Sequence, residues 1–300
     1  MFIVHNRKFF YGLSIILIVA SLAAFFVWGL KFGIDFKGGS LLEVEYASER
    51  PASEVVLGTL ESAGVEGSSV RPTGEKGYLI RTPFLSPDEY SVVKGALSQN
   101  GTTPFEEKRF DSIGPSIGSE LQTKSVYAIV LVLLAIVLFI MFAFRKVSKP
   151  VASWKYGVTA LLALAHDIII PVGVFAALGH FLGAEVDTLF VTAVLVVLGF
   201  SIHDTIVVFD RVRENLRRNT EKNIQEDFEL TVGKSITQTI ARSINTSLTT
   251  VLALSALYIF GPAVTHYFVL ALIVGIVAGT YSSIFIASPL LVTLQKLQGK

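Results

Sequence analysis

Long uncharged runs follow one another along this chain, and their lengths predict helices that cross a membrane. A helix needs about 20 apolar residues to span the hydrocarbon core of a bilayer. Four runs meet this requirement without any charged side chain: residues 11–30, 125–144, 243–260 and 267–294. We expect each of them to form one transmembrane helix.

Two further runs, residues 157–178 and 189–209, are equally apolar except for a few ionisable side chains. Each contains one His-Asp pair, and the four residues are His166, Asp167, His203 and Asp204. Because their lengths also suit a bilayer, we expect these runs to be spans as well. The pattern therefore predicts six transmembrane helices.

The first run has two interpretations. Arg7 and Lys8 precede it and small residues lie near its end, as in a cleaved signal peptide. It is nevertheless longer than a typical signal-peptide core and continues through Phe25, Phe26 and Trp28. We therefore favour an uncleaved span.

Residues 31–122 contain no long apolar run and predict a compact soluble insert between the first two spans. The predicted elements are a strand at 42–46, a helix at 51–63, strands at 68–71 and 78–82, a helix from Ser86 to about residue 100, and a strand at 106–111. Ser86 precedes a proline and two acidic residues, which is a typical helix start. The resulting β-α-β-β-α-β order is that of ferredoxin-like domains.

The predicted fold is therefore an α-helical polytopic membrane protein with an inserted α+β ferredoxin-like extracytoplasmic domain. Its parts are residues 1–30 with the first transmembrane helix, the insert at 31–122, and five further transmembrane helices within 123–300. A charged segment near 210–242 is expected to be a cytoplasmic amphipathic helix, because Asp210 and Arg213 have the spacing of a helical ion pair.

The positions of Lys and Arg predict the orientation of the spans, because these residues favour cytoplasmic flanks. With the N-terminus inside, the inner segments hold Arg7, Lys8, Arg145, Lys146, Lys149, Lys155, the cluster from Arg211 to Arg242, Lys296 and Lys300. The short outer loops near residues 179–188 and 261–266 contain neither Lys nor Arg. We expect both termini in the cytoplasm and the insert outside.

Composition agrees with lipid as the solvent and excludes several classes of function. Hydrophobic residues make up 52% of the chain and charged residues 16%, against about 25% charged in soluble proteins. The net charge of +1 gives no reason to expect nucleic acid as a partner. The absence of cysteine removes disulfides and thiolate metal sites. The insert has no catalytic Ser, His or Cys constellation, so we expect neither an enzyme nor a cofactor or metal.

A glycine-containing segment, FGIDFKGGS at residues 32–40, joins the first span to the insert. A phosphate-binding loop is disfavoured, because the P-loop spacing is missing and the segment would lie outside, away from nucleotides. Gly38 and Gly39, which follow Asp35 within the same motif, instead predict a tight bend or a close backbone approach.

The ionisable residues within the spans are the main indication of function. An Asp that faces lipid near the centre of a bilayer costs at least about 2.5 kcal/mol, so such residues face partner helices or a water-filled path. His166 and Asp167 lie near the middle of the third span, and Asp204 lies nearer the inner end of the fourth. His203 is expected to point about 100° away from Asp204.

Two interpretations of these residues remain open. They can join helices through hydrogen bonds alone, or they can form a proton relay. Two His-Asp pairs on consecutive spans, with Arg242 leading into the fifth, favour the relay. In it, Asp204 would alternate between an anion paired with Arg242 and a neutral acid. In the sixth span, Gly275 and Gly279 instead predict close helix packing.

Five motifs together resemble those of the SecF family, the smaller half of the bacterial SecDF protein-export factor in the resistance-nodulation-division superfamily. They are FGIDFKGG at 32–39, AHD at 165–167, GFSIHDTIVVFDRVREN at 199–215, SINTSLTT at 243–250 and GTYSS at 279–283. The resemblance covers nearly the whole chain. It implies that the six spans are half of a bundle completed by a SecD-like partner in the bacterial inner membrane.

The resemblance also implies a function. Members of the family act with the SecYEG channel, the SecA motor and YajC, and their outer domains pull emerging polypeptides as protons flow inward. Asp204 matches the proton-carrying aspartate of the family and Arg242 its neighbouring arginine, whereas His203 stands where the family has asparagine. We count His166, Asp167, His203 and Asp210 as further candidates for the relay.

Two other functions are compatible with the sequence. Half of a proton-coupled small-molecule transporter of the same superfamily would share the scaffold, although an insert of about 90 residues leaves little room for the large porter domains of such pumps. A structural scaffold without transport chemistry would tolerate a neutral substitute for every carboxylate within the spans. A substitution at Asp204 distinguishes that scaffold from a proton-driven subunit.

Overall fold

The computed structural model describes residues 2–145 and 151–298 and divides into two compact units. One unit comprises Met1–Lys31 and Tyr127–Lys300, and the other comprises Phe32–Val126. Three of the cationic residues used to predict the orientation, Lys146, Lys149 and Lys300, lie outside the described residues.

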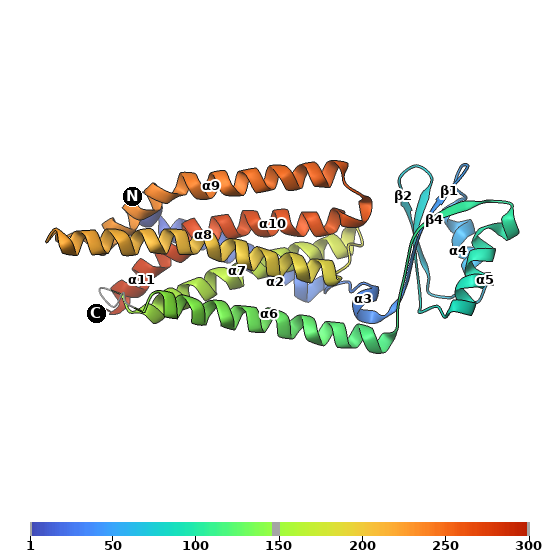
Figure 1. Cartoon of the computed structure of the whole chain (residues 1–300), viewed down its shortest axis with the longest axis horizontal. Helices are drawn as coiled ribbons and strands as arrows, with labels where there is room; N and C mark the ends of the chain where they lie inside the picture. The colour runs from blue at the N-terminus through green and yellow to red at the C-terminus, as the bar shows by residue number, and fades with distance from the viewer. Residues whose placement is uncertain (1, 146–150, 299–300) are drawn as a thin grey trace. The chain divides into compact units, whose positions relative to one another are not determined.

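Within the described ranges, six helices are long and apolar enough to cross a membrane, as predicted. They are α2 (Arg7–Trp28), α6 (Pro115–Ala143), α7 (Ser153–Phe181), α8 (Thr188–Glu221), α9 (Phe228–Phe260) and a sixth formed by α10 (His266–Ser282), the π-helical segment η3 (Ser283–Ala287) and α11 (Ser288–Gln298). Two short elements, α1 (Phe2–His5) and η2 (Ala263–Thr265), precede α2 and α10. The long helices run side by side (Figure 1).

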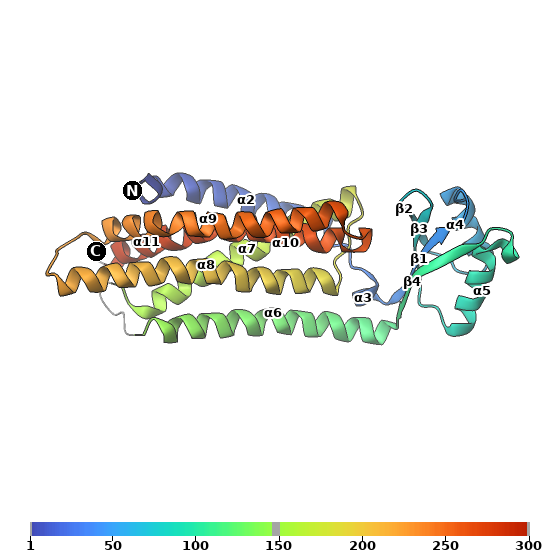
Figure 2. The ribbon, with the colours of Figure 1, turned by 45° about the horizontal axis from the view of Figure 1, so that its top comes forward.

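The six helices differ in how much of their apolar surface the chain itself covers. Buried residues make up about half of the most apolar stretches of α7, α8 and α10–α11 but only 6–11% of those of α2, α6 and α9. Figure 2 shows α2 and α6 at opposite margins of the helical unit. The less buried helices are therefore available to lipid or to another chain, and α7 and α8 hold the buried carboxyls described below.

Glycine allows α8 and α10 to approach each other closely. A Cβ atom on Gly275 would lie 2.3 Å from a methyl group of Val197, and one on Gly279 would lie 2.8 Å from Cβ of Ser201. Both distances are shorter than van der Waals contact, so a side chain at either position would separate the helices. Gly173 of α7 has the same role against Ser21 of α2, 2.3 Å from its would-be Cβ.

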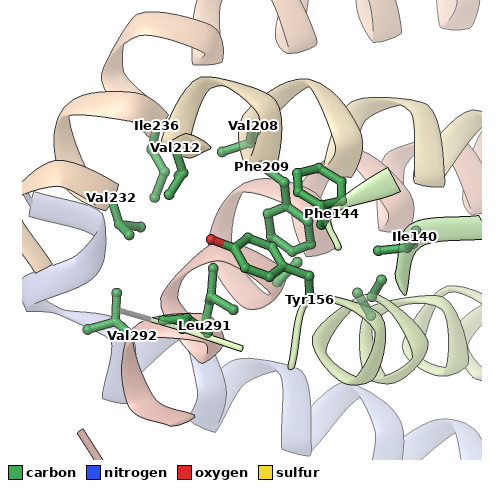
Figure 3. Packing of buried hydrophobic residues seen from close by; sticks show 14 of the residues in the cluster. Ile140, Phe144, Tyr156, Val208, Phe209, Val212, Val232, Ile236, Leu291 and Val292 are labelled. Carbon is green, nitrogen blue, oxygen red and sulfur yellow. The ribbon is translucent and has the colours of Figure 1, made fainter. Parts of the chain in front are cut away.

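Aromatic packing fixes the helices at the end of the unit that holds α11. The rings of Phe144 and Tyr156 stack with centroids 5.0 Å apart, and Phe209 meets both of them edge-on. Figure 3 shows this cluster surrounded by aliphatic side chains of α8, α9 and α11. The packing joins five separate stretches of chain and so fixes the rotation of α8, which carries Asp204.

The second unit is a four-stranded antiparallel sheet with two helices, in the predicted β-α-β-β-α-β order. Its elements are β1 (Gly39–Tyr46), α4 (Ser53–Ser62), β2 (Ser69–Thr73), β3 (Gly77–Thr82), α5 (Pro87–Leu97) and β4 (Phe105–Ile113). The strands lie in the order β2-β3-β1-β4. Short helices, α3 (Ile34–Lys37) and η1 (Gln99–Gly101), precede β1 and β4.

Both helices of this unit cover the same face of the sheet (Figure 1). Alternate residues of β1, such as Leu42 and Val44, point into a core that α4 and α5 close with Leu60 and Val93. The predicted helix start at Ser86 is confirmed, because its hydroxyl and the Glu89 side chain form a reciprocal capping box.

The glycine motif that leads into the sheet lies in backbone conformations that suit glycine. Gly38 has φ +77° and Gly39 has φ +134°. A Cβ on Gly38 would lie 2.8 Å from Cα of Pro115, and one on Gly39 would lie 2.8 Å from the carbonyl oxygen of Thr82. Asp35 lies in the first turn of α3, directly before them.

Candidate functional site

Helices α7 and α8 bring three of the four ionisable span residues into the interior of the helical unit. Asp167 is completely buried, and only 2% of His166 and 3% of Asp204 is exposed. His203, one residue before Asp204, lies on the exposed side of α8. The two His-Asp pairs of the sequence are therefore not equivalent.

Asp167 accepts hydrogen bonds at both carboxyl oxygens. Its Oδ1 lies 2.9 Å from Nδ1 of His166. Its Oδ2 receives the hydroxyl of Ser282 at 2.8 Å and also the hydroxyl of Ser201. These partners come from α7, α8 and α10, so one carboxyl joins the three central helices.

The glycine contact between α8 and α10 explains why two serines reach one oxygen. Ser201 lies directly over Gly279, and Ser282 follows three residues later on the same helix as that glycine. Residues three apart share a helix face. A larger side chain at Gly279 would therefore pull one of the two hydroxyls away from Asp167.

His166 has one satisfied and one unsatisfied ring nitrogen. Nδ1 faces Asp167, whereas the buried Nε2 has no hydrogen-bond partner within the part of the chain that the structure describes. The ring lies against Tyr281, with centroids 5.9 Å apart. The Tyr281 hydroxyl donates to the carbonyl oxygen of Phe10 at 2.9 Å and accepts from Ser14. The His-Asp pair is thus linked to α2.

Asp204 has a much poorer set of partners than Asp167. Its buried Oδ2 and the buried hydroxyl of Ser243 have no hydrogen-bond partner among the described residues. Ser243 and Ser247 of α9 face this carboxyl. Ser247 in turn bonds to Thr280 of α10 at 2.5 Å. Asp204 therefore lies in a polar environment that leaves one of its oxygens open.

The structure does not bring Arg242 into a pair with Asp204. Arg242 is exposed, and its guanidinium forms no hydrogen bond or ion pair with any described residue. Its neighbour Ser243 occupies the position against Asp204, and successive helix residues point about 100° apart. His203 is likewise exposed. Within the described residues of this chain, the expected Asp204-Arg242 pair is absent.

Asp210 is separated from the buried residues. It lies exposed on the charged continuation of α8, where it forms an ion pair with Arg213 at the predicted spacing. An exposed pair of this kind contributes little to stability. The geometry of Asp210 is therefore that of a solvated helix face.

Hydroxyl groups are the residues around the two carboxyls that sequence reasoning missed. They are the buried Ser201, Thr205, Ser243, Ser247, Ser282 and Ser283 and the half-buried Thr280. A signal for them existed, because serines and threonines recur within otherwise apolar runs beside the acidic residues. Their partners could not be inferred, since that requires knowing which helices are neighbours.

The two buried carboxyls differ in how completely their oxygens are bonded. An unpaired carboxylate in a dry interior is costly, and a proton or a cation relieves that cost. Among the described residues, the buried Oδ2 of Asp204 has no hydrogen-bond partner. Asp167 has three partners, which lie on α7, α8 and α10.

One cavity of about 440 Å³ lies elsewhere, beside α1 and the start of α9. It is lined by Phe2, Val4, His5, Asn6, Asp227, Glu229 and Leu230. None of the ionisable span residues borders it, so it is separate from the site.

Two family models match the chain. The model for the C-terminal part of the protein export membrane proteins SecD and SecF matches residues 92–297, and the model for the SecD/SecF GG motif matches residues 23–49. The second range includes Gly38 and Gly39. The two models together cover most of both units.

The chain is also similar to curated proteins and solved structures. It is 43% identical to the protein translocase subunit SecF of Thermobaculum terrenum, over 97% of this chain and 93% of the relative. It is 39% identical to SecF of Anaerolinea thermophila, over 97% and 92%. The crystal structure of SecDF from Thermus thermophilus matches with a TM-score of 0.82 at 30% identity, over 98% of this chain but only 38% of that longer one. The chain therefore belongs to the SecF family of protein translocase subunits.

Proposed function

We propose that this chain is an auxiliary subunit of the Sec protein-translocation machinery that couples inward proton flow to the late export or release of polypeptides. The observation that carries the proton coupling is Asp204, a buried carboxyl in a span with one oxygen left open. The similarity of the chain to SecF proteins supports a transport role rather than an enzymatic one.

The proposed topology puts both termini in the cytoplasm of the bacterial inner membrane and the sheet unit outside. Arg7, near one end of the chain, and Lys296, near the other, both bind Glu229 at the start of α9. The two ends therefore lie on one side of the helical unit, which supports an even number of crossings. The charge distribution favours the cytoplasm for that side.

The exposed polar residues of α8 and α9 support a second six-helix half as partner. His203, Arg242, Asn245 and Thr249 are exposed at positions within or next to otherwise apolar spans. Such side chains are costly in contact with lipid. A SecD-like half provides polar partners for them, and there Arg242 can act near a carboxyl. The solved relative is named SecDF and is much longer than this chain, as a protein that joins two halves would be.

In the assembled machine, we propose that the sheet unit is a ferredoxin-like domain that engages translocating polypeptides. The strand order and the two helices on one face support this fold. SecYEG, SecA and YajC are the expected further partners. A small-molecule transporter is less well supported, because the sheet unit contains only residues 32–126 and the similar curated proteins are translocase subunits.

The experiment compares Asp204→Asn with the unmodified chain in vesicles that contain the whole export complex. We expect the variant to assemble normally and to lose the proton-dependent stimulation of export, because asparagine cannot take up and release a proton. Glu214→Gln, which changes an exposed acid on the same helix, is the matched control and keeps the stimulation. Full stimulation by Asp204→Asn would refute the proposed coupling.

A further inference from the structure

Five consecutive residues, Gly279 to Ser282 at the end of α10 and Ser283 at the start of η3, contact several other helices. We call this segment the α10 junction. Gly279 contacts Ser201 of α8, and Thr280 bonds to Ser247 of α9. Tyr281 contacts His166 of α7 and Phe10 of α2. Ser282 bonds to Asp167 of α7, and Ser283 bonds to Thr205 of α8. One short segment therefore touches four helices of the bundle.

The α10 junction reaches both intramembrane carboxyls. On one side, Ser282 donates directly to Asp167 at 2.8 Å. On the other side, Thr280 bonds to Ser247, which faces Asp204. Ser283 lies 2.9 Å from the hydroxyl of Thr205, the residue that follows Asp204. The titratable neighbours of the two carboxyls are His166 and His203.

The hydroxyls of Ser282 and Ser283 each have more hydrogen-bond acceptors within reach than hydrogens to donate. Ser282 lies 2.8 Å from Asp167 Oδ2 and 3.1 Å from the carbonyl oxygen of Gly279. Ser283 lies 2.8 Å from that same carbonyl and 3.2 Å from the carbonyl of Ser201. Each hydroxyl carries one hydrogen. A change of charge at Asp167 therefore bears directly on which acceptor the Ser282 hydroxyl bonds, and the shared carbonyl of Gly279 links that hydroxyl to Ser283.

The helix is also least regular at this point. Ser283 begins the π-helical segment Ser283–Ala287, which interrupts the α-helical hydrogen-bond pattern between α10 and α11. Such segments occur frequently at functional sites. The carbonyl of Gly279, which both Ser282 and Ser283 can bond, lies in the last regular turn before it. A change in the hydrogen bonds that Ser282 and Ser283 donate to this carbonyl thus acts directly on the backbone at the break.

We propose that the α10 junction couples the two carboxyls, with Thr280, Ser282 and Ser283 as positioning residues that transmit a change of charge at Asp204 to Asp167. This inference rests on the proposed function of Asp204. In this proposal, Asp167, which is bonded to three helices, responds to the change of charge at Asp204. The π-helical break between α10 and α11 is the part of the chain that moves in response.

The test measures the coupling itself by infrared spectroscopy on the full chain purified with its partner half. The carboxyl bands of Asp167 are identified by their loss in Asp167→Asn. We expect Asp204→Asn, which fixes the neutral state, to displace those bands in the otherwise unmodified chain. Thr280→Val combined with Ser283→Ala should abolish that displacement. Thr280→Ser, which keeps the hydroxyl, and Ser21→Ala, a buried serine outside the junction, should preserve it.

Export assays separate this inference from the proposed function. We expect Thr280→Val to reduce proton-dependent stimulation about fivefold, as for one lost hydrogen bond, and Thr280→Ser to restore it. The inference is contradicted if Asp204→Asn leaves the Asp167 bands in place. It is also contradicted if the displacement of those bands survives Thr280→Val combined with Ser283→Ala. Either result counts against the junction even if Asp204→Asn abolishes stimulation of export. If Asp204→Asn retains full stimulation, the proposed function fails instead.

Discussion

Asp167 and Asp204 lie in neighbouring helices, yet their surroundings suit opposite tasks. Asp167 receives three hydrogen bonds from three helices, whereas Asp204 keeps a buried oxygen without a partner among the described residues. A carboxyl bonded to several helices contributes to their packing, whereas an oxygen without a partner contributes no such bond. At the scale of single residues, the chain thus separates a carboxyl that joins three helices from one that keeps an open oxygen.

This difference predicts that substitutions at the two aspartates lower the free energy of unfolding by different amounts. Asp167→Ala loses three hydrogen bonds worth roughly 0.6 kcal/mol each in a membrane protein, so it should lower the free energy of unfolding by about 2 kcal/mol. Asp204→Asn should change it by less than about 0.5 kcal/mol, since little bonding is lost. Unfolding of the detergent-purified chain measures both. Equal losses would contradict the separation of roles.

A pH dependence is expected in the sheet unit. The ammonium of Lys94 and the hydroxyl of Tyr90 both donate to Glu107 and hold the pKa of that carboxyl below its usual range. Because the folded-state pKa is lower than the unfolded value of about 4.3, this stabilisation is complete above that value and is lost as the pH falls through the folded pKa.

Hydrogen exchange in α5 and β4 of the full chain, measured between neutral and acidic pH, tests this expectation. Protection should fall with acid in the unmodified chain. In Glu107→Gln that component of the fall should disappear, because the side chain no longer titrates. An identical acid profile in Glu107→Gln and the parent would show that the contact has no energetic role.

At the scale of elements, close helix packing determines which hydroxyls reach Asp167. Gly275→Val should destabilise the chain by about 1–3 kcal/mol, the usual cost of overpacking, because the new side chain would overlap Val197. Gly199→Ala on α8 is the matched control, since nothing lies within 4 Å of its would-be Cβ. Thermal unfolding of the purified chain compares them, and equal midpoints would contradict the packing described.

Helices and strands were predictable from the sequence wherever a single physical requirement determines them. The spans follow from hydropathy, because backbone groups in lipid must be satisfied within a helix. The strands and helices of the sheet unit follow from alternation and from the cap at Ser86. The helix ends were less accessible: the charged segment near 210–242 was expected as an amphipathic helix of its own, but its two parts continue the spans, because α8 extends to Glu221 and α9 begins at Phe228. The uncharged run at 267–294 was expected to form one helix, and its π-helical break was not predicted.

The site was only partly predictable, for a related reason. Burial of Asp167 and Asp204 follows from the cost of charge in lipid. The expected pairing of Asp204 with Arg242 is not found among the described residues, because the rotation of α9 directs Ser243 to that carboxyl instead. Helix rotation depends on packing against neighbours, as between Gly275 and Val197. No single run of sequence contains that information.

At the scale of the whole molecule, the chain combines a helical unit that holds two buried carboxyls with a separate sheet unit. Its exposed polar positions on α8 and α9 support the proposed second half, and the chain corresponds to 38% of the solved SecDF chain. We expect purification from native membranes to yield a second six-span protein bound to this one. Recovery of the chain alone under mild detergent conditions would contradict that proposal.

Proton movement is the central claim, and direct measurement of proton flux tests it. The chain and its partner half are placed in vesicles that enclose a pH-sensitive dye, and an acidic outside pH is imposed. We predict acidification of the lumen with the parent chain, none beyond the background leak with Asp204→Asn, and parental flux with Glu214→Gln. Parental flux through Asp204→Asn would contradict the claim.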